Sequence, residues 1–348
     1  MTQRIEWIDT AKGIGIYLVV TGHLLANNPP DSRLAEHLIW AFHMPLFFFL
    51  SGLTHRPAAP GRVMEEISRT AKAIGMPYLF FSLLSIALWW TGTPADARGH
   101  GLDDAFATLL SGVSGREKGL FYNIPLWFFP CLFSVRMLAV LAGAMLGENR
   151  TRLLVAACGL AALAHLVLFP VLPRLPWNLD VAIVAGVFYA AGHRLAGTPA
   201  LDSLLTHRFV APVAGMSLLL GGCLLNGRVD MNYRDFGQPL LFYVAAAGGI
   251  ATTLWLSKRL EALRWLRTVG VASVVIFPMH GLLQYFLPGN ALATLTWYAF
   301  RATGSGVVGA LLMGVLEVAM CLPFYGLLAR HAPVCIGRFP RRAARVAS

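Results

Sequence analysis

The chain of 348 residues has few charged side chains: Asp, Glu, Lys and Arg make up 13% of it, against 57% hydrophobic residues. No polar block is long enough for a separate soluble domain, and no internal repeat is evident. The missing repeat weighs against a transporter built from two matched halves. The shortage of charge along the whole length excludes an ordinary soluble protein and predicts a polytopic membrane protein.

Cysteine is also scarce and shows no pattern. The five cysteines are scattered, mostly inside apolar runs, and no CxxC pair occurs. This distribution predicts neither a disulfide framework nor a zinc site, so we expect no metal and no bound cofactor. No small-residue cleavage site follows the first apolar run, which is therefore expected to be a retained span and not a signal peptide.

Apolar runs recur from end to end and predict an all-α fold of about ten transmembrane helices, in a single integral-membrane domain over residues 1–348. The predicted spans are 11–27, 38–54, 74–91, 122–146, 152–170, 180–196, 209–226, 238–256, 269–287 and 305–329. The first two are short for a hydrocarbon core of ~30 Å.

The formal net charge of +11 is distributed unevenly. Most of the 28 lysines and arginines fall on alternate connections, including 55–73, 257–268 and the C-terminal tail 330–348. The positive-inside rule then predicts that both termini are cytoplasmic, and we expect a multi-pass protein of a bacterial inner membrane. The basic cytoplasmic tail is expected at the membrane surface, not on nucleic acid.

Ionisable residues inside apolar spans are the first functional candidates, because a charge in hydrocarbon is costly. A helix rises about 1.5 Å per residue, so Lys12 and His23 lie roughly 16 Å apart along the first span. His43 has a similar depth in the second span, and the two histidines are expected to share a pocket on antiparallel helices. The alternative for each is a histidine that is hydrogen-bonded inside the bundle.

Four further spans carry deep polar groups. Arg136 and Glu317 fall near mid-membrane with opposite charges, which predicts a structural ion pair. His280 lies in the ninth predicted span. His165 has no polar neighbour in sequence and is expected to be structural.

Two short motifs occur toward the cytoplasmic side. Ser51 and Gly52 end an aromatic string, and such a small pair allows close approach of another backbone. Arg69 and Lys72 are three residues apart, so a helix presents both cations to one side. Such a pair suits phosphate groups, although the charges alone favour an ordinary positive-inside flank.

Taken together and in order, these segments resemble the integral-membrane acyltransferase-3 family, whose members O-acylate sugars of surface polysaccharides, lipopolysaccharides and related glycans. The resemblance covers most of the chain. Its segments are 4–23 with Lys12 and His23, 42–52 (FHMPLFFFLSG), 69–78 with Arg69-x-x-Lys72 and Pro-Tyr, 126–129 (LWFF), 175–180 (LPWNLD) and 273–281 (SVVIFPMHG). The family commonly has two arginines in the basic loop, so Lys72 is a mild departure.

The resemblance implies ten helices, a cytosolic acyl-CoA donor, expected to be acetyl-CoA, and a glycan or lipid-linked saccharide acceptor. A sugar hydroxyl gains from a positioned base such as a neutral imidazole, and a basic rim suits the phosphates of the donor. The candidate site residues are the catalytic His23, His43 and His280, the donor-binding Lys12, Ser51, Arg69 and Lys72, and the structural or orienting Asp9, Arg136 and Glu317.

Two alternatives stay open. On the same fold, the enzyme would transfer a succinyl or longer acyl group. From another class, a transporter would use the buried histidines, Arg136 and Glu317 as a proton relay. In every case we expect membrane lipids as partners and no nucleic acid.

Overall fold

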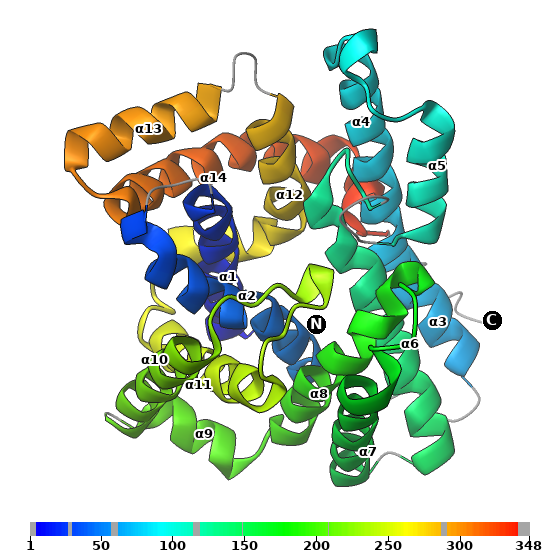
Figure 1. Ribbon diagram of the computed structural model, residues 1–348. Coiled ribbons are helices and arrows are strands. Elements are labelled where there is room, and N and C mark those ends of the chain that lie inside the picture. The colour runs from blue at the N-terminus through cyan, green and yellow to red at the C-terminus, as the bar shows by residue number, and fades with distance from the viewer. Residues whose placement is uncertain are drawn as a thin grey trace, which may run out of the picture.

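The computed structural model describes residues 5–26, 30–56, 62–113, 119–147, 149–207, 209–286 and 291–339. Within these segments the backbone is helical apart from its connections, and an isolated bridge between Asp230 and Asp235 is the strand-like pairing (Figure 1). The expected all-helical, polytopic membrane fold is confirmed.

The helices follow one another along the chain with short turns of 3₁₀ or π geometry between several of them. Their bounds are α1 Glu6–Leu25, α2 Arg33–Leu53, α3 Val63–Thr70, α4 Met76–Gly92, α5 Leu102–Ser111, α6 Phe128–Leu146, α7 Arg150–Leu163, α8 Leu179–Leu195, α9 Pro199–Thr206, α10 Gly215–Asn226, α11 Pro239–Arg259, α12 Arg264–Phe286, α13 Ala291–Thr303 and α14 Gly306–His331.

A helix lies over each of the ten predicted spans, but fewer are both long and apolar enough to cross a membrane. In the described part of the chain seven helices meet both conditions, or eight if the bent pair Pro176–Leu195 and Pro199–Thr206 forms one span. With the bent pair counted, two of the ten helices do not meet these conditions. Helix α10 is too short, since it belongs to the apolar helix Pro212–Asn226. Helix α1 is too polar, because its first two turns carry Glu6, Asp9 and Lys12.

In the predicted cytoplasmic segment 55–73, the described residues from Val63 onward are helical. Its helix α3 continues through a π-helical turn, Ala71–Gly75, into α4, so Val63–Gly92 is one helix of 30 residues. At 1.5 Å per residue it is about 45 Å long, which exceeds a ~30 Å hydrocarbon core. The N-terminal turns that carry Arg69 and Lys72 therefore extend beyond the apolar layer.

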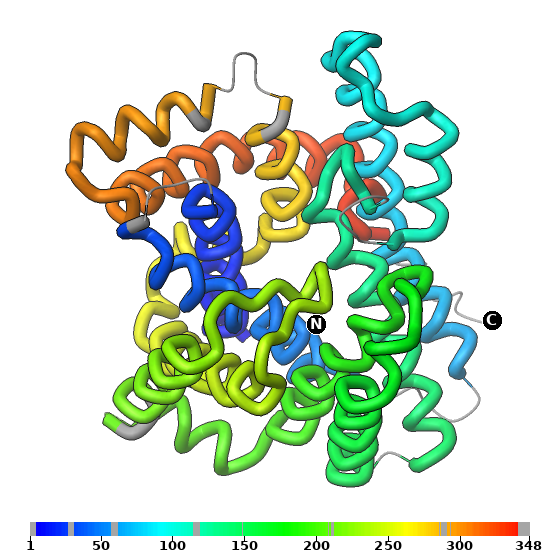
Figure 2. Tube along the Cα trace, viewed as in Figure 1, coloured from blue at the N-terminus to red at the C-terminus, as the bar shows by residue number. Residues whose placement is uncertain are grey.

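Helices α1 and α2 occupy the middle of the molecule (Figure 2). Helix α1 packs against α2, α11, α12 and α14, whereas α2 packs against α1, α8, α10 and α11. Glycine permits the closest crossings: a Cβ at Gly52 of α2 would collide with the carbonyl of Tyr189 on α8, and one at Gly270 of α12 with that of Asp9 on α1. The small pair Ser51-Gly52 thus lies at such an approach.

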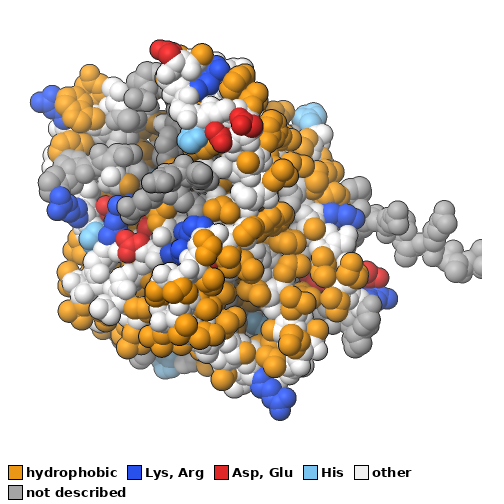
Figure 3. Space-filling model, turned by 45° about the vertical axis from the view of Figure 1, so that its right-hand side comes forward, with side chains coloured by type: hydrophobic (Ala, Val, Ile, Leu, Met, Phe, Trp, Pro, Cys, Tyr) orange, Lys and Arg blue, Asp and Glu red, His pale blue; other side chains and the backbone are white. Residues whose placement is uncertain are grey.

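Hydrophobic side chains cover the middle and lower part of the face in Figure 3. Among the spanning helices α7 is the most peripheral, since Leu153 and Ala161 are its buried residues and the large apolar Val155 is 65% exposed. In a bilayer such an outward-facing apolar helix contacts lipid.

The first part of the C-terminal tail is structured. Helix α14 continues to His331, and a 3₁₀ turn, Pro333–Ile336, brings Gly337 against the carbonyl of Ala73. Arg338 donates to the Tyr325 hydroxyl at 2.7 Å. The predicted tail of 330–348 is therefore folded onto the start of α4 as far as residue 339, and residues 340–348 lie outside the described part.

Candidate active site

Three histidines from three helices meet at one end of the α1–α2 pair. The ring centroids of His23 on α1 and His280 on α12 are 4.9 Å apart, and Trp40 of α2 lies between His23 (5.4 Å) and His43 (5.7 Å). His23 and His43 both line a cavity of about 220 Å³. The structure thus places the histidines of the first two spans on one cavity, with His280 directly behind His23.

The small residue before His23 explains how α2 comes so close. A Cβ at Gly22 would lie 3.0 Å from the Ile39 side chain, tighter than ordinary packing. Across the same contact the indole of Trp40 donates to the Gly22 carbonyl at 3.3 Å. The Thr-Gly-His sequence therefore lets an aromatic residue of α2 pack beside the His23 ring.

The backbone fixes the same tautomer in all three histidines. Each Nδ1 faces the carbonyl oxygen four residues earlier: Val19 at 2.9 Å for His23, Ile39 at 2.8 Å for His43 and Ile276 at 3.2 Å for His280. A carbonyl only accepts, so Nδ1 must carry the proton and Nε2 of a neutral ring keeps its lone pair. Each imidazole is thereby anchored with its basic nitrogen available.

A proline and an asparagine shape α12 next to His280. Pro278 lacks an N–H and interrupts the helical hydrogen bonding. The buried amide of Asn123 donates to the Pro278 carbonyl and to Ser85, both at 3.0 Å. Gly281 makes room, because a Cβ there would collide with the Asn123 side-chain oxygen.

Glu317 reaches the same region through a neighbour. Its carboxylate is fully buried on α14 and accepts a hydrogen bond from Gln284 of α12 at 3.0 Å. Gln284 itself lines the histidine cavity. Glu317 therefore orients a cavity residue from behind.

The expected ion pair between Arg136 and Glu317 is not formed. Two of the three guanidinium nitrogens of Arg136, Nε and Nη2, donate to the Ser51 hydroxyl at 3.3 Å, on a different set of helices. Helix α6 packs against α7 and α8, whereas α14 packs against α1, α12 and α13. Depth along a span follows from the sequence, but which helix becomes the neighbour does not, and the pairing was wrong for that reason.

A loop that the sequence did not single out closes the cavity. Residues 227–238 join α10 to α11, and Arg228, Asp230, Asn232 and Tyr233 line the cavity beside Trp127. Arg228 lies 5.1 Å above the Trp40 ring and 3.5 Å from a Glu36 oxygen. Burial raises the pKa of Asp230 to about 6, against the opposing effect of Arg228. The signal in the sequence was the charged string between two apolar runs.

An ionic cluster holds this loop in place. Asp180, at the start of α8, is 1% exposed and lies 3.0 Å from Arg174 Nε and 3.4 Å from Arg234 Nε. Arg174 also donates to the Asn232 carbonyl at 2.8 Å. Arg234 adopts φ 58°, a strained conformation that the surrounding contacts maintain. The Leu-Pro-Trp-Asn-Leu-Asp segment thus anchors one wall of the cavity.

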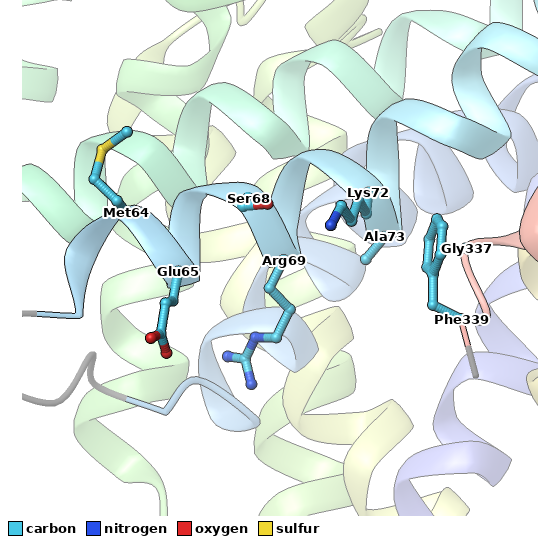
Figure 4. Close-up of a pocket in the computed structure, with 8 residues that line it drawn as sticks. All are labelled: Met64, Glu65, Ser68, Arg69, Lys72, Ala73, Gly337 and Phe339. Carbon is cyan, nitrogen blue, oxygen red and sulfur yellow. The ribbon is translucent and has the colours of Figure 1, made fainter. Parts of the chain in front are cut away.

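Arg69 and Lys72 lie at a second, larger cavity of about 620 Å³, formed by the start of the long α3–α4 helix and the end of the chain (Figure 4). Arg69 forms an ion pair with Glu66 and remains 62% exposed. Phe339, 41% exposed, faces this helix across the cavity. The cavity combines two cations and one exposed aromatic ring with the carboxylate of Glu65.

The other predicted residues at the start of α1 contribute differently. Asp9 is buried where α1 crosses α12, and Lys12 is half-buried one turn further on. An ion pair between Glu6 and Arg267 ties the same two helices. Neither Asp9 nor Lys12 is among the described residues that line the two cavities.

In the described segments, no group of three or more His, Cys, Asp or Glu side chains is placed to hold a metal ion. In the comparisons with known proteins, the profile of a family described as an acyltransferase domain matches residues 5–323. No curated protein and no solved structure matches significantly.

Proposed function

The chain belongs to the acyltransferase-3 family, and from this premise we propose that it transfers an acetyl group from acetyl-CoA to a sugar hydroxyl of a surface polysaccharide or lipid-linked glycan. Membrane acyl transfer follows from the family. The donor, the acceptor and the residues below are our proposal.

The observation that carries the proposal is the anchored His23 ring on a polar cavity. With Nδ1 bound to the Val19 carbonyl, Nε2 is the base that takes the proton of the sugar hydroxyl. The hydroxyl oxygen attacks the thioester carbonyl, the C–S bond breaks, and the proton passes from His23 to the departing CoA thiolate. His280, edge-on to His23 at 4.9 Å, positions the ring.

The lining of the cavity supports a sugar as acceptor. Trp40 and Trp127 provide flat apolar surface, while Arg228, Asp230 and Asn232 provide donors and acceptors for hydroxyl groups. Ligand sites typically combine such apolar surface with a few placed polar groups. His43 and Gln284 complete the polar side.

The basic cavity supports a nucleotide-bearing donor. Arg69 and Lys72 suit the phosphates of acyl-CoA, because both are basic side chains with several hydrogen-bond donors. Phe339 offers a ring on which the adenine can stack. Segments 64–73 and 337–339, which the charge pattern assigns to the cytoplasmic side, meet in this one cavity.

The histidine cavity is built from segments that the same pattern assigns to the opposite side. Along α1 the separation from Lys12 to His23 is about 16 Å. We propose that the donor enters from the cytoplasm and that its extended thioester arm bridges this depth. The family favours this scheme over transport, and Arg136 and Glu317 do not form the relay that transport would use.

The experiment is incorporation of label from [acetyl-¹⁴C]acetyl-CoA into a glycan extract by purified protein in liposomes. Labelled glycan supports the proposal. Succinyl-CoA and butyryl-CoA, run in parallel, test the alternative acyl groups. Release of labelled acetate without labelled glycan, or glycan uptake without transfer, would contradict it.

A further inference from the structure

A third cavity lies away from both sites, on the lipid-facing side of α6, α7 and α8. Its volume is about 360 Å³. Small residues make its floor, among them Ala142, Ala156, Ala157, Ala182, Gly186 and Ala190. A Cβ at Gly186 would meet nothing within 4 Å, so the space beside this residue is open. We refer to this cavity as the α6–α8 groove.

The length of the groove matches one leaflet. Along α8 it runs from Ala182 to His193, which are about 16 Å apart on a helix. One leaflet accounts for about half of a ~30 Å hydrocarbon core. The groove therefore accommodates a hydrocarbon chain of ordinary membrane-lipid length, whereas a polyprenyl chain would extend far beyond it.

One end of the groove is polar and incompletely satisfied. His193 is 2% exposed, lines the groove, and neither of its ring nitrogens has a hydrogen-bond partner within the described residues. Its ring lies 4.7 Å from that of His55, whose Nδ1 is 2.7 Å from the Tyr189 hydroxyl. Leaving a buried polar group without a hydrogen bond costs free energy. A ligand oxygen that accepts a hydrogen bond from the His193 ring would remove this cost.

Cations surround the same end. Arg150 donates to the Ala196 carbonyl at 2.6 Å and Arg194 to the Thr151 hydroxyl at 3.0 Å, which joins the start of α7 to the end of α8. Arg136 lies with His55 and Tyr189 at an adjoining small cavity, which Arg56, Arg69 and the carboxylate of Glu66 also line. The described residues that line the groove include no carboxylate. Basic pockets between spanning helices suit anionic lipid head groups.

We propose that the α6–α8 groove binds one anionic glycerophospholipid. One acyl chain lies along Ala182 and Gly186, an ester or phosphate oxygen accepts a hydrogen bond from His193, and the head group lies among the arginines at the helix ends. The lipid is a bound structural partner, separate from donor and acceptor.

The test uses phosphatidylglycerol with a diazirine in one acyl chain, at low fraction in phosphatidylcholine vesicles that contain the purified protein. After photolysis, peptide mass spectrometry maps the adducts. We expect adducts on α6, α7 and α8, displaced by unlabelled phosphatidylglycerol but not by phosphatidylcholine.

Two test variants and one control variant sharpen the test. Gly186→Leu fills the open space and should lower labelling of the groove at least about fivefold. Gly159→Leu is the matched control, because a Cβ at this exposed glycine of α7 also meets nothing within 4 Å; its labelling should stay within twofold of the original protein. His193→Phe keeps an aromatic ring but cannot donate the proposed hydrogen bond to the lipid. It should weaken competition by phosphatidylglycerol about fivefold to tenfold.

Equal labelling of the Gly186→Leu and Gly159→Leu proteins would overturn the proposal, as would equal displacement by phosphatidylcholine. Displacement by polyprenyl phosphate or dodecanoyl-CoA but not by phosphatidylglycerol would also overturn it, and would assign the groove to acceptor or donor. Because only binding is measured, the result is independent of acyl transfer.

Discussion

Neutralising Asp180 should release the loop that closes the histidine cavity. The carboxylate is 1% exposed and lies within 3.4 Å of two guanidinium groups whose side chains are 19% and 17% exposed. In Asp180→Asn, Arg174 and Arg234 remain close together without their counter-charge. Breaking a buried ion pair on one side costs about 3–5 kcal/mol. Since both arginines are partly solvated, we expect about 3 kcal/mol.

The assay is chemical unfolding in detergent, followed by acceptor saturation kinetics. The loss of stability should be accompanied by a raised acceptor KM with an unchanged KM for acyl-CoA, because Arg174 and Arg234 hold the loop that carries Asp230 and Asn232. The matched control is Glu261→Gln, which breaks the 2.8 Å pair with Lys258 at a more exposed site. That pair should contribute about 0.5 kcal/mol or less.

Equal destabilisation of the Asp180→Asn and Glu261→Gln proteins would refute this reasoning. So would a destabilised Asp180→Asn protein with normal acceptor KM, because the cluster would then stabilise the fold without placing the loop.

Three further predictions concern the basic cavity and two groups outside the spans. Replacing Arg69 and Lys72 with alanine should raise the KM for acyl-CoA about tenfold, since two charged phosphate contacts are lost at a partly exposed site, and should leave acceptor KM unchanged. The acceptor KM should change near pH 6, the pKa to which burial raises Asp230, and the change should be absent in Asp230→Asn. Burial next to His193 and Arg136 lowers the pKa of His55 from 6.5 to about 4, so its contribution to stability should be lost as pH falls from 6.5 to about 4.

Each of these has a control or a contrary outcome. Arg152→Ala, at an exposed position at the start of α7, should leave the KM for acyl-CoA unchanged; an equal effect would reduce Arg69 and Lys72 to general surface charge. An inflection near pH 6 that persists in Asp230→Asn would assign it to another group. His55→Gln should flatten the fall in unfolding free energy between pH 6.5 and about 4, and an unchanged slope would exclude His55 as its source.

The helical membrane fold was predictable because hydrophobic runs of bilayer length have few alternatives. The sequence also predicted that His23 and His43 share one cavity, because two antiparallel helices joined by a short connection place residues of equal depth side by side. The number of spans was less certain. Both α1 and α10 coincide with predicted apolar runs. However, α1 has a polar start and α10 is short, so neither meets the conditions for a membrane span.

The rotation of each helix about its axis and the identity of its neighbouring helices could not be predicted from the sequence. A span does not show which helix its polar face meets, so Arg136 was assigned to Glu317 although it binds Ser51. The loop with Arg228 and Asp230 was missed for a related reason: a charged connection is expected outside the membrane, and only its anchorage through Asp180 turns it back over the cavity.

Turnover of the purified His23→Gln protein in liposomes shows whether His23 is the base of the acyl transfer. Loss of a general base typically lowers turnover by 10²–10⁴, and we predict a loss in this range with membrane insertion and unfolding midpoint retained. His165→Gln is the control, because this histidine packs against Phe236 and Tyr243 away from the cavity, and its turnover should be normal. A stable, inserted His23→Gln protein with turnover within about threefold of the original would exclude His23 as the base.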